Sequence, residues 1–127
     1  MREILFRAKR IYNGEWVEGY YLYYSHMGKV EHIIVTEVPQ IYSKMHTVIP
    51  ETVGQYTGLT DKNGKKIFEG DILDENGHLF TVAYDQKWAK FKLFHDSKAI
   101  QYPEWNRGVL MKVIGNIHDN PELLEAD

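Results

Sequence analysis

Acidic side chains gather near the middle of the sequence, where they could hold a metal ion or move a proton. Glu69, Asp71, Asp74 and Glu75 follow one another closely along the chain. Carboxylates grouped in this way would suit a magnesium site or a general acid–base pair. No further ligand recurs at a defined spacing, so the favoured interpretation is a solvated strand face followed by a turn.

Two nearby motifs fail the spacing that their chemistry requires. The segment Gly58–Lys66 resembles a phosphate-binding loop, but it has one residue too many between its glycines and no hydroxyl residue for magnesium. Asp61 and Asn63 resemble the start of a calcium loop. Lys66 and Ile72 stand where that loop needs glycine and glutamate, so we reject both motifs.

The other residue types argue against catalysis. The sequence has no cysteine, which excludes thiol nucleophiles, disulfides and cysteine-ligated metals. Its six histidines form no His-x-His or His-x-x-x-His pair. No serine stands in a nucleophile elbow. We therefore expect a protein that is not an enzyme and that uses no cofactor and no metal.

A basic and aromatic segment is the better candidate for binding. Strand alternation would place Phe91 and Leu93 toward a core and cations and rings on the opposite face. The residues of that opposite face would be Trp88, Lys90, Lys92 and Phe94. This mixture is typical of platforms for single-stranded nucleic acid, and the alternative is an ordinary outer face covered by lysine stems. The net charge of −3 argues against a uniformly basic binder.

Large aromatic side chains occupy both faces of another expected strand. Alternation places Trp16, Tyr20 and Leu22 on one face, which we expect to cover the core. Tyr21 and Tyr23 on the other face would contact a second copy of the chain. A homo-oligomer follows because soluble proteins rarely leave a large apolar patch exposed. The alternative is a central strand that is covered on both sides within one domain.

The expected elements are strands joined by tight turns. Asn-Gly pairs recur between β-type residues, which is the strongest short-range signal for a hairpin. The candidate strands are Ile4–Arg10, Glu15–Tyr24, Lys29–Glu37, Thr52–Gly58, Ile67–Asp74, His78–Tyr84, Trp88–Phe94 and Val109–Ile117. One short helix is expected over Pro121–Glu125, and the strand pattern breaks over Pro39–Pro50 and Asp96–Gly108.

This pattern favours an all-β barrel or sandwich. The chain has 127 residues, enough for one domain whose core needs no disulfide. No apolar run approaches the roughly 20 residues of a membrane-spanning helix, so we expect an intracellular protein with no membrane partner. The residues expected to form the C-terminal core are Phe68, Ile72, Val82, Phe91, Leu93, Val113 and Ile117.

Three strings of residues resemble the YopX family, small proteins of phages and prophages of Gram-positive bacteria. Gln55–Leu73, with the sequence QYTGLTDKNGKKIFEGDIL, resembles the central motif of that family. Val113–Leu124 is similar to its closing motif, and Ile4–Ala8 is similar to its opening strand. Lys9-Arg10 departs from the Trp-Asp pair that often follows the opening string. The resemblance spans the whole chain.

The resemblance implies an all-β, YopX-like fold of antiparallel strands with an SH3-like small barrel in the C-terminal half. A single domain would span residues 1–127, with an N-terminal β lobe over 1–50 and the barrel lobe over 51–127. The gene would belong to a phage or prophage, and the protein would act in the cytoplasm of the bacterial host. We expect a non-catalytic interaction protein that self-associates, with a single-stranded nucleic-acid-binding module as the alternative. A phage or host protein is a further candidate partner.

Overall fold

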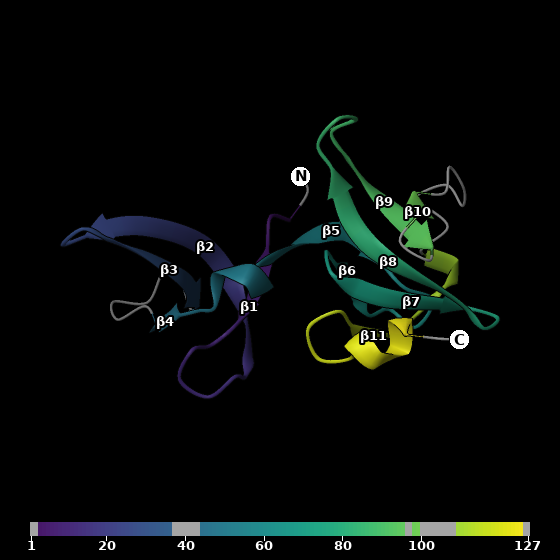
Figure 1. The fold of residues 1–127 in the computed structure, drawn as a ribbon, viewed down its shortest axis with the longest axis horizontal. Helices are drawn as coiled ribbons and strands as arrows, with labels where there is room; N and C mark the ends of the chain where they lie inside the picture. Colours follow the sequence, from purple (N-terminus) through teal and green to yellow (C-terminus); the bar gives the residue numbers. More distant parts are fainter. Residues whose placement is uncertain (1–2, 37–43, 96–97, 100–108, 126–127) are drawn as a thin grey trace. The chain divides into compact units, whose positions relative to one another are not determined.

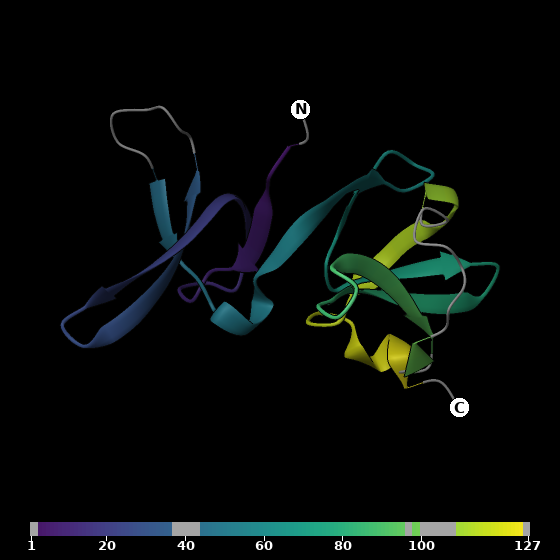
Figure 2. The same ribbon diagram turned by 90° about the horizontal axis from the view of Figure 1, so that it is seen from above.

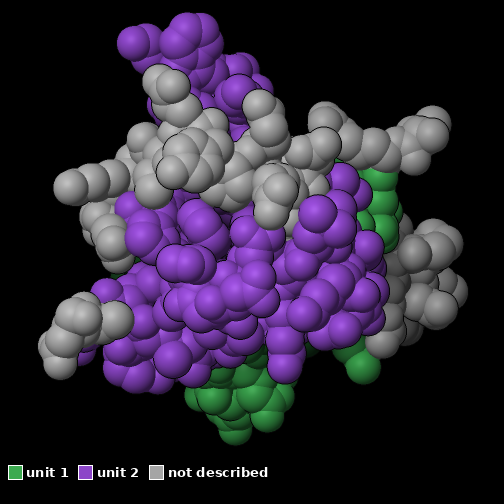
Figure 3. Space-filling view, turned by 90° about the vertical axis from the view of Figure 1, so that its right-hand side faces the viewer, with its two compact units in different colours: residues 1–56 green, residues 57–127 purple. Residues whose placement is uncertain are grey.

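The computed structural model describes residues 3–36, 44–95, 98–99 and 109–125. Over these residues the protein is built from antiparallel strands with only short turns of 3-10 helix (Figure 1). The expected all-β fold of antiparallel strands is confirmed. The chain divides into two compact units, residues 1–56 and residues 57–127, which Figure 3 shows in different colours.

The first unit is an antiparallel sheet with one long hairpin. Its elements are β1 (Phe6–Lys9), β2 (Trp16–His26), β3 (Lys29–Thr36), β4 (Lys44–Thr47), the 3-10 helix η1 (Pro50–Thr52) and β5 (Gly54–Thr60). The hydrogen-bonded order is β4-β3-β2-β1-β5, and β5 continues into the second unit. The hairpin of β2 and β3 extends beyond β1 and β4, as Figures 1 and 2 show from two directions.

A small core holds the first unit together. Ala8, Ile34 and Val48 are buried against one another. The half-buried side chains that pack on them are Phe6, Val17, Tyr21 and Val53. Each of the three buried residues comes from a different part of the chain, so the core links β1 and β3 to the segment that follows β4.

Strand β4 was not predicted, because its sequence carries no alternation of apolar and polar residues. It lies inside Pro39–Pro50, where the strand pattern was expected to break. Its side chains are mostly exposed, and only His46 is half-buried. The strand is defined by its pairing with β3, which begins with Ile33 opposite Thr47. This pairing depends on the tertiary structure and is not encoded in the local sequence.

The second unit contains a five-stranded antiparallel sheet. Its elements are β6 (Lys66–Phe68), β7 (Asp71–Glu75), β8 (His78–Asp85), β9 (Lys90–His95), β10 (Lys98–Ala99), β11 (Lys112–Asn116) and the 3-10 helix η3 (Pro121–Leu124). The sheet order is β10-β9-β8-β7-β11, with β7, β8 and β9 forming a meander. The helix expected at Pro121–Glu125 is present as η3, in its tighter 3-10 form.

The strand expected over Ile67–Asp74 is divided in two at Gly70. Gly70 has a φ of +93°, which a residue with a side chain would adopt only with strain. Its N–H donates to the carbonyl of Val82 at 2.8 Å, and its carbonyl accepts the N–H of Ile117 at 2.9 Å. Because the chain turns here, β6 and β7 are separate strands, and the alternation expected for one strand does not continue through it.

The core of the second unit agrees with the predicted core in part. Phe68, Ile72, Val82, Leu93 and Val113 are buried as expected. Phe91 is half-buried and packs on the core, whereas Ile117 is 40% exposed and was wrongly assigned. Four further residues are buried that were not predicted, and the buried cluster consists of Ile67, Leu73, Phe80, Val82, Leu93, Met111 and Val113.

Replacing Leu93 with alanine should destabilise the protein by about 2–5 kcal/mol, because it leaves a cavity in this cluster. The matched control is Leu110→Ala, since Leu110 is 60% exposed and should change the free energy of unfolding by less than about 0.5 kcal/mol. Urea unfolding followed by circular dichroism measures both. Equal effects of the two substitutions would contradict the placement of the core.

Candidate functional site

The hairpin of β2 and β3 is a two-stranded ribbon closed by a tight turn. Met27 and Gly28 have φ values of +50° and +80°, the combination that a type I′ turn requires. His26 and Lys29 flank this turn as the first pair of the ladder, which continues to Tyr20 opposite Val35. The right-handed twist of this turn type matches that of the strands, so a long, regular hairpin can form.

The outer part of this hairpin has few neighbours in the described part of the chain. Strand β1 pairs with β2 only as far as Gly19, and β4 pairs with β3 only from Ile33 onward. Between residues 20–26 and 29–32 the two strands pair with each other. We call these residues, together with the turn, the hairpin arm.

Tyr21 and Tyr23 lie on one face of the arm and share a histidine. The Tyr21 hydroxyl is 2.7 Å from His32 Nδ1, and the two rings stack with centroids 6.0 Å apart. Tyr23 lies directly opposite His32, with ring centroids 5.7 Å apart. Burial raises the pKa of the Tyr21 hydroxyl, and the neighbouring Tyr23 raises it further. The two predicted contact residues are therefore brought together.

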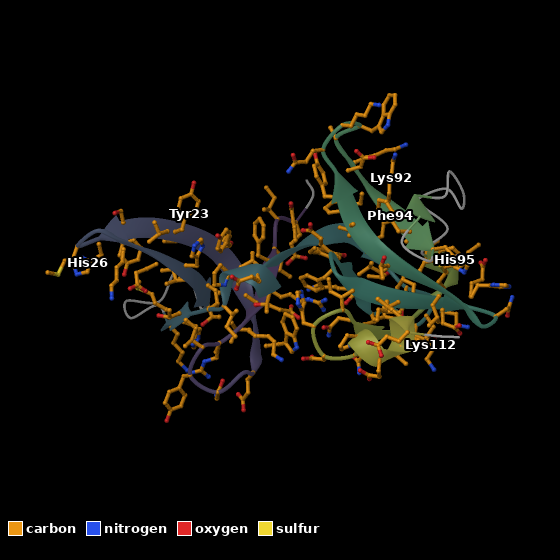
Figure 4. The ribbon with its side chains drawn as sticks, in the orientation of Figure 1. Tyr23, His26, Lys92, Phe94, His95 and Lys112 are labelled. Atoms are coloured by element: carbon orange, nitrogen blue, oxygen red, sulfur yellow. The ribbon has the colours of Figure 1, made fainter. Side chains whose placement is uncertain are left out.

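The two tyrosines differ in exposure. Tyr21 is half-buried because it packs on the core of the first unit and lies against Phe6, with ring centroids 5.6 Å apart. Tyr23 is 66% exposed and projects from β2, as its label in Figure 4 shows. The Tyr23 side chain is consequently accessible from solvent, whereas the Tyr21 side chain contributes mainly to the packing of the first unit.

The prediction that Trp16, Tyr20 and Leu22 cover the core is wrong. Tyr20 is 59% exposed and Leu22 is 42% exposed. Trp16 is half-buried, but its ring lies 4.7 Å from the guanidinium of Arg7, and it is not in the core cluster. The core face of β2 is the face of Tyr21, which packs on the core of the first unit. Hydrophobicity alone did not identify this face, because both faces of the strand carry amphipathic rings.

Gly19 is a feature of β2 that the sequence analysis did not identify. It is buried, and a Cβ atom there would lie 2.3 Å from the carbonyl oxygen of Val35. Glycine is therefore required at the point where β2 crosses from its pairing with β1 into the arm. A glycine in the middle of an apolar strand is the signal that could have revealed this close approach.

Exposed apolar side chains cover both faces of the arm. Strand alternation sends Tyr23 to one face and Leu22 and Tyr24 to the other, and all three are exposed. The exposed large hydrophobic residues of the arm are Tyr20, Leu22, Tyr23, Tyr24, Met27 and Val30. Among the residues that the structure describes, no layer packs on the two-stranded ribbon here, so these side chains are exposed.

Trp88 does not lie on a strand, which corrects the predicted nucleic-acid face. It occupies the turn between β8 and β9, where Asp85 accepts the N–H groups of Lys87 and Trp88 at 2.9 and 3.3 Å. Ala89 follows with a φ of +54°, which sends the chain back into β9. The alternation that was expected from Trp88 onward therefore begins only at Lys90.

Trp88 nevertheless lies close to two lysines, Lys92 of the predicted face and its sequence neighbour Lys87. It is 62% exposed, and the Nζ atoms of Lys87 and Lys92 lie 5.6 and 5.8 Å from its ring centroid. Lys92 also forms an ion pair with Asp85 at 2.6 Å. The hydrogen bond from Lys92 lowers the pKa of the Asp85 carboxyl. Lys92 is thus partly neutralised before any phosphate could approach it.

The two remaining residues of the predicted face lie along β9. Lys90 is exposed, and Phe94 is half-buried. Lys92 and Phe94 are labelled in Figure 4, where both project from β9. Together with Lys90 they occupy alternate positions, while Leu93 is buried in the core.

Two of the four clustered acidic residues, Asp71 and Asp74, have structural roles. Asp71 is almost fully buried and accepts the N–H of Phe68 at 2.7 Å, across the turn at Gly70. Asp74 accepts the N–H of Gly77 at 2.9 Å in the turn between β7 and β8. Among the described residues, no group of three or more His, Asp or Glu side chains is placed to hold a metal ion.

Asp61 accepts three backbone N–H groups and was not identified as important from the sequence. Its Oδ1 accepts the N–H groups of Asn63 and Lys65 at 2.8 and 2.9 Å. Its Oδ2 accepts the N–H of Val113 in β11 at 2.9 Å. The carboxylate therefore fixes the Asn-Gly turn after β5 and ties it to β11. An aspartate two residues before Asn-Gly is the local signal for the turn, but nothing local indicates the bond to Val113.

The chain belongs to the YopX family. The family model described as YopX protein matches residues 5–125. The crystal structure of protein EF1440 from Enterococcus faecalis is similar, with 27% sequence identity and a TM-score of 0.57 over 98% of this chain and 99% of that one. No curated protein matches the chain.

None of the described helices has the length and apolar character needed to cross a membrane. The helical elements named in the fold are short 3-10 segments, η1 and η3. This finding agrees with the hydropathy of the sequence, which contains no long apolar run.

The free energy of unfolding should fall in acid, because protonation of the Asp61 carboxylate weakens its bonds to the backbone. Burial raises the pKa of the Asp61 carboxyl, but the N–H groups of Val113, Lys65 and Asn63 and the charge of Lys65 lower it more, so the folded-state pKa lies below the ordinary value. The contribution of the Asp61 carboxylate to the free energy of unfolding is fully present above the unfolded-state pKa of about 3.9. It is lost as pH falls through the folded-state pKa.

Asp61→Asn should lower the free energy of unfolding at neutral pH by about 1–3 kcal/mol, because an amide cannot accept from all three donors. It should also reduce the acid dependence of stability. Urea unfolding at several pH values measures both effects, and Glu122→Gln, at an exposed residue of η3, is the control. An acid dependence that Asp61→Asn leaves unchanged would contradict this role.

Proposed function

We propose that this YopX-family protein is a non-catalytic interaction module that self-associates through its hairpin arm. The observation that supports this proposal is the apolar surface of the arm, where Tyr23 is exposed beside Tyr21 and His32. Surfaces of this kind on soluble proteins mark contacts with other proteins, and tyrosine is enriched in such contacts.

The biological setting forms part of the proposal. The chain acts in the cytoplasm of a bacterial host as the product of a phage or prophage gene, and membership of the YopX family supports this origin. The second unit is an SH3-like small barrel, which the meander of β7, β8 and β9 and the short β6 support. Such a unit carries no catalytic group in this proposal, and its buried carboxylates Asp61 and Asp71 bind its own backbone.

Tyr23→Asp should weaken self-association, because it places a charge on the apolar face of the arm without removing a core side chain. Tyr21→Asp is a poorer probe, since Tyr21 also packs on the core. The control is Tyr12→Asp, because Tyr12 is exposed in the turn between β1 and β2. Sedimentation equilibrium at micromolar concentrations should show a dimer or larger closed oligomer for the protein and for Tyr12→Asp.

Two outcomes would contradict this proposal. A single species of 14.9 kDa over the whole concentration range would exclude self-association. An oligomer that Tyr23→Asp and Tyr12→Asp affect equally would retain the association but exclude this face of the arm.

Single-stranded nucleic-acid binding is the second candidate function, and the surroundings of Trp88 favour it. An exposed indole with two lysine ammonium groups within 6 Å could stack on a base while the cations approach the phosphates. The ion pair of Lys92 with Asp85 and the net charge of −3 reduce this attraction, which is why we place this function second.

Trp88→Ala should weaken binding of a thymidine oligonucleotide by about 1–3 kcal/mol through lost base stacking. Fluorescence anisotropy measures the affinity, which should fall steeply as salt is added. Tyr12→Ala removes an exposed ring from the other unit and serves as the control. Absence of binding at low salt, or equal loss with the control, would contradict this second function.

A further inference from the structure

We propose that two copies of the chain join edge to edge through β2, so that their sheets form one continuous antiparallel sheet. This inference rests on the proposed self-association and specifies which atoms make the contact. The contact would consist of backbone hydrogen bonds from the outer edge of β2, with the tyrosines of the two copies side by side.

The turn of the hairpin determines which residues of β2 face its outer edge. Met27 and Gly28 form a two-residue turn, in which the carbonyl of His26 accepts the N–H of Lys29. Hydrogen-bonded and non-hydrogen-bonded pairs alternate along an antiparallel ladder. The even-numbered residues of the arm, such as Tyr24, therefore bond to β3, and the odd-numbered residues direct their N–H and C=O groups to the opposite edge.

Two observed hydrogen bonds agree with this alternation. Val48 donates its N–H to the carbonyl of His32 at 3.0 Å, on the side of β3 that faces away from β2. His32 is opposite Tyr23, so neither residue of this pair bonds to the other. At the start of β2, Glu15 accepts the N–H of Arg10 at 2.9 Å, which directs odd-numbered residues toward β1.

Within the described part of the chain, the outer edge of β2 is open beyond the end of β1. The last pair between the two strands joins Phe6 to Gly19, and no strand of the described residues pairs with this edge further along. Tyr21, Tyr23 and Ser25 consequently direct their backbone donors and acceptors outward. An edge of this kind is a template for pairing with another strand.

The occupant that suits this edge is a second copy of the same strand. Residues 20–26 of β2 contain no Asp, Glu, Lys or Arg, whereas the opposite strand of the arm, residues 29–32 of β3, includes Lys29 and Glu31. Charges along an edge protect it from pairing, so β2 is the unprotected edge of the arm. Because residues 20–26 are uncharged, antiparallel pairing of this segment with its own copy places no like charges opposite each other.

A two-fold axis at Tyr23 satisfies the open groups of both copies. Tyr23 would lie opposite Tyr23 of the second copy, and Tyr21 would lie opposite Ser25. Residues directly opposite in an antiparallel pair point to the same face, so the two exposed Tyr23 rings would contact each other. Leu22 would lie opposite Tyr24 on the other face, which covers further exposed apolar surface of the arm.

The test is a pair of proline substitutions at two residues that face each other across the arm. Ser25 and Val30 form a non-hydrogen-bonded pair, so the N–H of each points to a different outer edge and neither is needed by the ladder. Ser25→Pro removes a donor from the β2 edge, and Val30→Pro removes one from the β3 edge. Ser25→Ala controls for loss of the hydroxyl.

Sedimentation equilibrium should show that Ser25→Pro raises the dimer dissociation constant by at least about tenfold, because the donor is lost in both copies. Val30→Pro and Ser25→Ala should leave it nearly unchanged. Circular dichroism of both proline variants checks that the fold is retained. Association that resists Ser25→Pro, or that Val30→Pro weakens equally, would exclude the β2 edge while self-association stands. A protein that is monomeric before any substitution would exclude both proposals.

Discussion

The structure of the first unit depends on a mismatch in strand length. Every backbone N–H and C=O group in a sheet needs a partner, and β2 is much longer than the strand beside it. Strand β1 satisfies the edge of β2 only to Gly19, after which β2 continues to His26. The open edge, the exposed tyrosines and the proposed pairing of two copies all follow from this difference.

Two buried carboxylates of the second unit are satisfied by its own backbone. Buried carboxylates at Asp61 and Asp71 accept backbone N–H groups across turns, and Asp61 also bonds to β11. These bonds fix the turns that the apolar core then covers. The two units thus differ: buried carboxylates complete the turns of the second, and the arm of the first exposes apolar surface.

Local sequence predicts much of this fold, and the errors have identifiable causes. Turn residues and β-type residues locate most strands, because both signals are local. Glycine at position 70 allows a bend, but the division of the expected strand Ile67–Asp74 into β6 and β7 was not predicted, because the bonds of Gly70 to Val82 and Ile117 join residues that are distant in sequence. The core face of β2 was misassigned because its two faces carry similar rings. Trp88 was placed on a strand because the turn held by Asp85 has no Asn-Gly signal.

Hydrogen–deuterium exchange of individual β2 amides, followed by NMR as protein concentration is raised, tests the edge pairing most directly. The Tyr23 and Ser25 amides point away from β3, so they should exchange rapidly at low concentration and become protected as copies associate. The Leu22 and Tyr24 amides, which bond to β3, serve as internal references whose protection should depend much less on concentration. Rapid exchange of the Tyr23 and Ser25 amides at concentrations where the protein is oligomeric would contradict pairing through the β2 edge.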